Sequence, residues 1–370
     1  MKKAGIIGCG NIAQVHAWAI GNLRDVRLTA LCDIDIKKAE NLAEKISSSN
    51  KAEKSAEKTG CVNQMEKPAE KTGSLDQTED PDTETDHSYV KIHENWKDFL
   101  NSDLNVIHVC TPHFLHAPMA SELLKNGKAV FVEKPCAISL EQFEELKKAD
   151  SERPGKLGFC LQNRYNETTL LIERLVSEGT IGDILGGRAF VTWRRDDGYY
   201  TGSAWKGRLQ TEGGGALINQ SIHTLDLLLG FLGEPIAVKG SIANHHLKDS
   251  HIEVEDTVEA WMEFSDGKRA CFYASNGYAS DAPVILELQG EKGRICMNGS
   301  DVTVYRDGEA PEHYICEQKH GIGKNYWGCG HKACIEDFYR CLDNGETFRN
   351  SLAGVENSFR TMMRIYGECD

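Results

Sequence analysis

The sequence predicts an α/β protein of two domains. Residues 1–160 are expected to form a parallel sheet with helices, and residues 161–370 an α+β domain with an open, mainly antiparallel sheet. The length of 370 residues suits two domains. In the first half, short apolar runs alternate with helical patterns, as in strands joined by crossover helices. In the second half, apolar and polar residues alternate between turn signals, which favours antiparallel strands.

Apolar runs with little polar alternation predict the buried strands of the first domain, because a parallel sheet is covered on both faces. These runs lie at residues 4–7, 27–32, 105–110, 129–133 and 157–160. Helical patterns fall between them, at residues 11–20, 35–46, 118–126 and 139–149. Strand and helix therefore alternate throughout this domain.

Residues 47–88 interrupt the alternation. The pentapeptide Ala-Glu-Lys-Thr-Gly occurs at 56–60 and again at 69–73, and an acidic stretch without a basic residue follows. Such a segment has too few apolar residues to offset the entropy lost on ordering. It predicts a solvated, mobile insertion, and the functional alternative is a partner-binding or regulatory loop.

The second domain begins with motifs described below and continues as alternating strands. In residues 256–264, the apolar positions share one face and the polar positions the other; the apolar face comprises Val258, Ala260, Met262 and Phe264. A second strand is expected at 269–274, with turns at 290–293 and 307–308. Two helical patterns close the chain, at residues 331–343 and 351–366.

Composition excludes several classes of function. The 42 basic and 56 acidic residues leave a net charge of −14, which disfavours binding to nucleic acid or to an anionic membrane surface. No apolar run approaches the roughly 18 residues that a membrane helix needs. With no export signal at the start, the 13 cysteines are expected to be reduced thiols in a cytoplasm.

A glycine-rich turn follows the first predicted strand and opens the first predicted helix. It reads Gly8-Cys9-Gly10-Asn11-Ile12-Ala13, a G-x-G-x-x-A pattern. Gly8 permits the tight turn, Gly10 lets a pyrophosphate approach the backbone amides, and the helix N-terminus favours the anion. Asp33 ends the second strand, where a carboxylate accepts the ribose hydroxyls of NAD. We therefore expect a Rossmann domain that prefers NAD to NADP, although Lys37 and Lys38 lie near enough to meet a phosphate.

Four further motifs follow in order. They are Cys-Thr-Pro-His-Phe-Leu-His at 110–116, Glu-Lys-Pro at 133–135, Gln-Asn-Arg-Tyr at 162–165 and Gly-Gly-Gly-Ala-Leu-Ile-Asn-Gln-Ser-Ile-His-Thr-Leu-Asp at 213–226. With the glycine-rich turn before them, they resemble the Gfo/Idh/MocA family of sugar and polyol oxidoreductases. The resemblance covers nearly the whole chain apart from the insertion. It implies an NAD(P)-dependent dehydrogenase acting on the CH–OH groups of sugars.

The resemblance also implies which residues contact the cofactor. In similar proteins the Lys–Pro bond of the Glu-Lys-Pro motif is often cis. The expected cofactor-binding residues are Gly8, Gly10, Asn11, Ile12, Asp33, Thr111, Pro112, His116, Glu133 and Lys134.

Lys134 and His223 are the expected catalytic pair. Lys134 ends a parallel strand, where side chains enter the ligand crevice; its alternative is an ordinary surface lysine. His223 and Asp226 share a helix face, so that Asp226 is positioned to set the imidazole tautomer. We expect His223 to take the hydroxyl proton while Lys134 hydrogen-bonds the same oxygen. The alternative for His223 is a packed histidine on an amphipathic helix.

Asn219 marks a departure from the family pattern, because inositol-dehydrogenase-like members carry an aspartate four residues before the histidine. The asparagine disfavours myo-inositol, and the surrounding motif looks more like members acting on pyranosides or nucleotide sugars, with C3 as the expected carbon. Contacts to the substrate are expected from Lys134, Arg164, Tyr165, Asn219 and His223, with Tyr199, Tyr200 and Lys206 as further candidates for the pocket wall. Of Arg194 and Arg195, at most one is expected in the pocket.

A metal site is the competing interpretation of the C-terminal cysteines and histidines. Zinc accepts such ligands, but their spacing lacks the paired C-x2-C pattern of closed structural sites, and we predict no metal. The residues concerned are Cys316, His320, Cys329, His331 and Cys334, with a second group at His245, His246 and His251.

The sequence is also compatible with two other functions. One is a non-catalytic NAD-binding regulatory protein, and the other is a sugar–sugar oxidoreductase that holds its cofactor tightly. A homodimer or homotetramer is expected, because an antiparallel sheet with few following helices leaves one face to be covered.

Overall fold

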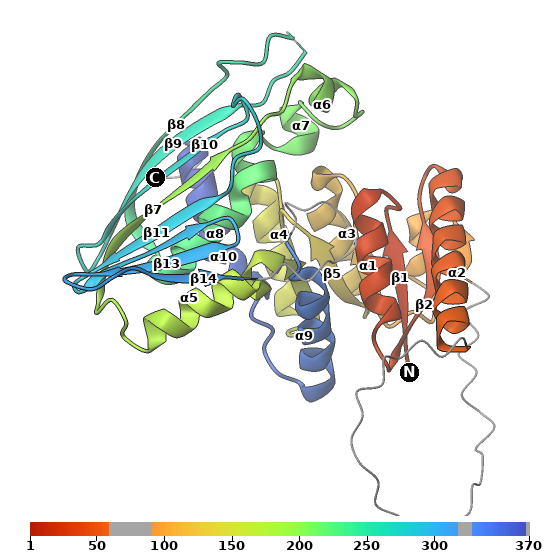
Figure 1. Cartoon of the computed structure of the whole chain (residues 1–370). Helices are drawn as coiled ribbons and strands as arrows, with labels where there is room; N and C mark the ends of the chain where they lie inside the picture. The colour runs from red at the N-terminus through yellow and green to blue at the C-terminus, as the bar shows by residue number, and fades with distance from the viewer. Residues whose placement is uncertain (59–89, 250, 317–327, 368–370) are drawn as a thin grey trace, which may run out of the picture.

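The computed structural model describes residues 1–58, 90–249, 251–316 and 328–367. It contains a six-stranded sheet of order β3-β2-β1-β4-β5-β6 and an eight-stranded sheet of order β14-β13-β12-β11-β7-β10-β9-β8 (Figure 1). Every helix in these ranges is too short or too polar to span a bilayer.

The first sheet is parallel throughout, as predicted. Its order reverses between β1 and β4, and in doubly wound sheets ligands bind at the carboxyl ends of the strands beside this point. All five predicted strands are confirmed, and β3 is an additional edge strand. The strands are β1 (Lys2–Ile7), β2 (Val26–Cys32), β3 (Lys91–His93), β4 (Val106–Val109), β5 (Ala129–Glu133) and β6 (Leu157–Cys160).

The helices of the first domain lie at the predicted places, with one difference in length. They are α1 (Asn11–Gly21), α2 (Ile36–Lys58), α3 (His116–Lys125) and α4 (Leu140–Ser151), with short 3-10 segments η1 (Trp96–Phe99) and η2 (His113–Leu115). The insertion was expected to begin at residue 47, but α2 continues to Lys58. Residues 51–58 are mostly lysine, alanine and glutamate, which are good helix formers, so the helix continues to Lys58 even though few residues are apolar. The remainder, 59–88, lies outside the described residues.

The second sheet is antiparallel except between β7 and β10, which run parallel. The predicted alternation in β9 is confirmed: its four apolar positions are buried against the helices. The strands are β7 (Ile184–Thr192), β8 (Pro235–Ala243), β9 (Thr257–Phe264), β10 (Arg269–Ser275), β11 (Ile285–Gly290), β12 (Gly293–Asn298), β13 (Asp301–Arg306) and β14 (Glu312–Ile315).

Helices cover one face of this sheet, with α8 and α10 packed against it (Figure 1). The helix α9 instead returns to the first domain, where Cys334, Ile335 and Phe338 join the apolar cluster of β1 and α1. The helical segments that follow β6 are η3 (Gln162–Tyr165), α5 (Glu167–Ser177), α6 (Asp197–Thr201), α7 (Leu209–Glu212), a π-helical turn η4 (Ala216–Ser221), α8 (Ile222–Leu232), α9 (His331–Asn344) and α10 (Leu352–Tyr366).

Candidate active site

The glycine-rich turn has the geometry that the motif predicts. Gly8 has a φ of +89°, and a Cβ there would lie 2.6 Å from the Cys110 carbonyl oxygen. At Gly10 a Cβ would meet no atom within 4 Å, so its backbone is open to a ligand. No side chain caps the N-terminus of α1, whose free N–H groups suit a pyrophosphate. The turn therefore fits the phosphates of a dinucleotide.

Asp33 lies directly beside this turn. Its carboxylate accepts hydrogen bonds from the backbone N–H of Cys9 at 2.8 Å and of Asp35 at 2.9 Å. An open cavity of about 210 Å³ adjoins the turn, and Lys38 and Lys45 are among its lining residues together with Asn11. Asp33 thus lies beside the glycine-rich turn, and its contact with the ribose hydroxyls of NAD stays a prediction.

Lys134 follows β5 and reaches across to the second domain. Its Nζ donates to the backbone oxygen of Asn219 at 2.7 Å and to the side-chain Oδ1 of the same residue at 3.0 Å. The Lys134–Pro135 bond is cis, as the resemblance implies. Burial lowers the pKa of Lys134 to about 8, although the carboxylates of Glu133 and Glu212 oppose the shift. Lys134 thus titrates close to neutral pH.

Glu212 is a buried acidic residue next to Asn219, and no motif in the sequence singled it out. Its buried carboxylate accepts from Asn219 Nδ2 at 2.6 Å and from the Gly207 N–H at 2.5 Å. Burial raises the pKa of Glu212 to about 7, against these hydrogen bonds and the nearby lysine charges. Its one sequence signal was its place directly before the triple glycine.

His223 lies in the first turn of α8, one turn beyond Asn219. Burial and the charge of Lys134 lower the pKa of His223 to about 3, so the imidazole is neutral. Its Nδ1 is buried and has no hydrogen-bond partner among the described residues. A buried polar atom without a partner is uncommon in proteins, and a bound ligand is one way in which it is satisfied.

Asp226 does not set the tautomer of His223, contrary to expectation. Its carboxylate accepts instead from Arg164 Nε at 2.7 Å, from Arg164 Nη2 at 2.5 Å and from the Ser358 hydroxyl. The guanidinium is the stronger competitor because it offers two parallel charged donors.

Arg164 and Tyr165 also lie differently from the prediction of substrate contacts. The other guanidinium N–H groups of Arg164 donate to the carbonyls of Arg349 and Gly354 and to Asn350 Oδ1, so that all five donors are engaged by protein. The Tyr165 hydroxyl donates to Asp337 Oδ2 at 2.7 Å on α9. Arg164 and Tyr165 therefore join η3 to its neighbours.

The Thr-Pro-His segment after β4 brings two loops together. The ring nitrogens of His116 lie 2.8 Å from the Pro135 carbonyl oxygen and 2.7 Å from that of Thr111. His116 is buried, so it links the turn at Thr111 and Pro112 to the Glu-Lys-Pro turn. Main-chain carbonyls thus lie beside both ring nitrogens of His116, whereas Thr111 and Pro112 are half-buried.

Glu133 ends a chain of buried hydrogen bonds. His16 Nε2 lies 2.8 Å from Glu133 Oε1, His16 Nδ1 lies 2.8 Å from His108 Nδ1, and His108 Nε2 lies 3.0 Å from the Tyr339 hydroxyl. Burial alone would raise the pKa of Glu133, but the hydrogen bond from His16 and nearby charges hold it well below its usual range. The predicted cofactor residue Glu133 is therefore an ionised carboxylate fixed from inside the domain.

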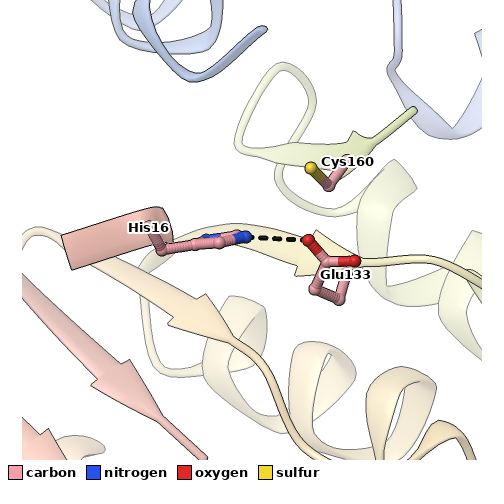
Figure 2. A group of neighbouring side chains, drawn as sticks. All are labelled: His16, Glu133 and Cys160. Atoms are coloured by element: carbon pink, nitrogen blue, oxygen red, sulfur yellow. Dashed lines mark hydrogen bonds and ion pairs between the residues drawn. The ribbon is translucent and has the colours of Figure 1, made fainter. Parts of the chain in front are cut away.

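His16, Glu133 and Cys160 bring three potential metal ligands within 4.8 Å of one another (Figure 2). Two ligands of one zinc ion would be about 3.3 Å apart, given zinc–ligand distances of about 2.0–2.2 Å. The 2.8 Å between His16 Nε2 and Glu133 Oε1 fits a hydrogen bond instead. Of the C-terminal candidates, Cys334 and His331 are buried on α9 and His320 lies outside the described residues.

Other predicted wall residues divide between the site and the core. Lys206 Nζ lies 3.7 Å from the ring centroid of Tyr199, whose hydroxyl accepts from Gln220 Nε2 at 3.1 Å. Tyr200 is buried in an apolar cluster of its own, so it does not line the crevice. Arg194 is exposed, whereas Arg195 pairs with Asp281 at 2.8 Å.

The fold and the site together define a dinucleotide-binding protein of the oxidoreductase class, with Lys134 at the carboxyl end of β5 and His223 on α8 near enough to be affected by its charge. Residues 2–158 match the oxidoreductase family with an NAD-binding Rossmann fold, and residues 169–296 match the Gfo/Idh/MocA C-terminal domain. The chain belongs to the Gfo/Idh/MocA family, and its cofactor is NAD.

Individual relatives are distant. Glucose-6-phosphate 3-dehydrogenase of Bacillus subtilis is 22% identical over 323 residues, 83% of this chain and 77% of that protein. Levoglucosan dehydrogenase of Pseudarthrobacter phenanthrenivorans is 23% identical over 228 residues, 55% of this chain and only 58% of that protein. The WlbA dehydrogenase of Bordetella pertussis, solved with NADH and UDP-GlcNAcA, superposes with a TM-score of 0.75 at 22% identity, covering 100% of this chain and 96% of that chain. At this identity the structural likeness shows the fold alone.

Proposed function

We propose that this protein is an NAD-dependent dehydrogenase that oxidises a ring hydroxyl of a sugar derivative. The observation that carries the proposal is the pair of hydrogen bonds by which Asn219 holds the Lys134 amine. Asn219 lies one helical turn before His223, whose imidazole is neutral. A pyranoside or nucleotide sugar is the substrate class, with oxidation at C3. Three relatives support this class: a levoglucosan dehydrogenase, a glucose-6-phosphate 3-dehydrogenase and the WlbA dehydrogenase solved with UDP-GlcNAcA.

Lys134 is the proton acceptor in this proposal. A neutral amine has two N–H bonds, and Asn219 supplies an acceptor for each of them. The lone pair of Nζ then points away from Asn219 and is available to accept a proton. A base is most effective when its pKa lies near the working pH, and the pKa of Lys134 is about 8.

His223 donates a hydrogen bond to the same hydroxyl oxygen. A buried N–H without an acceptor is rarely tolerated, so the proton of the neutral ring belongs on Nε2 rather than on the unpartnered Nδ1. With the pKa of His223 at about 3, this ring is a poor proton acceptor beside Lys134. These features support a division of roles opposite to the one expected from the sequence.

The hydroxyl proton passes to Lys134 Nζ, the carbinol C–H leaves as hydride, and the hydroxyl carbon becomes a carbonyl. NAD, when bound, supplies the hydride acceptor. The turn at Gly8 and Gly10 is positioned to hold its phosphates, and Asp33 its ribose.

A panel of glycosides, uronates, polyols and nucleotide sugars, mixed with protein and NAD, tests the proposal through NADH absorbance. At least one substrate is expected to give NADH, with kcat/KM rising as the pH increases through about 8. The proposed function fails if neither the panel nor its keto forms exchange hydride. A kcat/KM that instead falls above pH 8 returns the role of proton acceptor to His223.

Two further properties belong to the same proposal. Mass spectrometry of cofactor carried through purification distinguishes a dissociating NAD from the tightly held cofactor of a sugar–sugar oxidoreductase. A homodimer or homotetramer in the cytoplasm is the proposed state, and light scattering of the purified protein measures the assembly.

A further inference from the structure

Glu212 is a buried carboxylate that the reaction described above does not use. It ends α7, and Gly213 directly after it has a φ of +82° and turns the chain toward η4. A Cβ at Gly213 would lie 2.6 Å from the Cβ of Ile138, so the turn packs tightly against the first domain. Burying a carboxylate is costly unless hydrogen bonds satisfy it, and Glu212 has such bonds on both oxygens.

The amide of Asn219 connects Glu212 to Lys134. Its Nδ2 donates to Glu212 Oε1 at 2.6 Å, and its Oδ1 accepts from Lys134 Nζ at 3.0 Å. A carboxylate only accepts hydrogen bonds and a lysine only donates them to an amide oxygen. The amide therefore has a single orientation that satisfies both neighbours, and Glu212 fixes its Nδ2 end.

The main chain of Glu212 is tied to the opposite side of the crevice. The His113 Nδ1, from η2 in the first domain, lies 2.9 Å from the Glu212 carbonyl oxygen. Since burial and the charge of Lys134 keep the pKa of His113 well below its usual value, the ring is neutral and donates this bond. Glu212 is thus held by contacts from both domains while its carboxylate faces Asn219.

We propose that Glu212 is a positioning residue that acts through the side-chain amide of Asn219 to orient the Lys134 amine and to bias its affinity for the proton. The kinetic part of this inference rests on the proposed function, whereas the effect on Lys134 itself does not.

Other charged and titratable groups also face Lys134, and the bias from Glu212 adds to theirs. Glu133 favours the ammonium form and Lys206 disfavours it. The ionisable groups that interact with Lys134 are Glu133, Cys160, Lys206, Glu212, His113, His116 and His223. Lys206, Lys134, Tyr200 and Tyr366 interact with Glu212 itself.

The arrangement also explains why an uncharged residue stands at position 219. An aspartate there would face Glu212 across a 2.6 Å hydrogen-bond distance, and two carboxylates so close cannot both remain ionised. An asparagine bridges one carboxylate and one amine without adding charge.

We call the connection from Glu212 through the Asn219 amide to Lys134 the relay. Three variants test it: Glu212→Gln, Asn219→Asp and the double variant. The readout is the pH midpoint at which Lys134 reacts with a small amine-acylating reagent, measured by mass spectrometry without any substrate. Glutamine keeps the shape of Glu212 but lacks its charge. Its NH2 group cannot accept a hydrogen bond, so one of the two N–H donors, from Gly207 or from Asn219, loses its acceptor. The midpoint is expected to fall by about one pH unit in Glu212→Gln and to rise in Asn219→Asp. In the double variant, which again has one carboxylate, it is expected to return to or above the wild-type value.

Turnover is the second readout. In Glu212→Gln, kcat is expected to fall about ten- to a hundredfold, with the rising limb of kcat/KM displaced to lower pH and KM for NAD unchanged. Glu253→Gln is the matched control, because this exposed carboxylate accepts from the Leu209 N–H of α7 and has no contact with Asn219.

The outcomes separate the two hypotheses. If the midpoint of Lys134 is the same in the wild type, Glu212→Gln and Asn219→Asp, the relay is refuted whatever the turnover. If the midpoints move as expected but no sugar is oxidised, the relay stands and the proposed function fails. A drop in kcat without any displacement of the pH limb makes Glu212 merely structural and overturns the inference.

Discussion

Replacing Tyr339 with phenylalanine tests the buried chain that ends at Glu133. The hydroxyl lies 3.0 Å from His108 Nε2, and the exposed fractions of the two side chains are 3% and 0%. A hydroxyl both donates and accepts, so it satisfies either tautomer of His108. Phenylalanine leaves that ring nitrogen without a partner in a place that water does not reach.

The magnitude follows from this geometry. Stranding one buried polar atom costs about 1–3 kcal/mol of unfolding free energy. The packing contribution is small because a single oxygen atom is removed and the ring stays stacked on His108, with centroids 5.9 Å apart. We therefore expect Tyr339→Phe to lower the free energy of unfolding by about 2 kcal/mol.

Urea unfolding followed by circular dichroism measures this loss. Tyr314→Phe is the matched control, since its hydroxyl donates to Glu312 at 2.8 Å on the edge strand β14, where water replaces the lost bond. The control is expected to change the free energy of unfolding by less than about 0.5 kcal/mol. An equally small change in Tyr339→Phe would refute the view that the chain is a satisfied, stabilising network.

Three further predictions concern the site. Lys134→Met is expected to lower kcat more than about a thousandfold while NAD binding, followed by fluorescence titration, stays within about threefold of wild type; retained turnover would remove Lys134 from the reaction. Asp33→Ala is expected to raise KM for NAD about tenfold and to improve the use of NADP, because Lys38 and Lys45 then face a 2′-phosphate without an opposing carboxylate; steady-state kinetics with both cofactors decide this. The lowered pKa of Glu133 stabilises the fold above the unfolded pKa of about 4.3, and this contribution is lost as the pH falls below it. Urea unfolding at several pH values should therefore show a flatter acid dependence in Glu133→Gln than in the wild type.

Local patterns were enough to predict most of the first domain. The runs at 129–133 and 157–160 coincide with β5 and β6, because a strand buried on both faces must be apolar along its whole length. The glycine-rich turn and Asp33 were equally predictable, since a tight turn and a helix N-terminus need particular residues at neighbouring positions. The end of α2 was missed because helix propensity, rather than burial, extends it.

Contacts between distant segments were not predictable in the same way. Asp226 lies one turn from His223, yet it pairs with Arg164, sixty-two residues away in sequence. Glu212 carried no pattern of its own, and its importance follows from meeting Asn219, Gly207 and His113 in space.

The sequence by itself determined the class of fold, the cofactor and the residue types available for chemistry, because periodicity and short motifs depend on neighbours along the chain. Only the tertiary structure decided which partner each buried carboxylate has. Asp226 pairs with Arg164 of η3, Glu133 is hydrogen-bonded by His16, and Glu212 is connected to Lys134 through Asn219. The physical reason is that hydrogen bonding and burial act over a few ångströms in space, and partners at that distance are set by how the two sheets and α9 pack together.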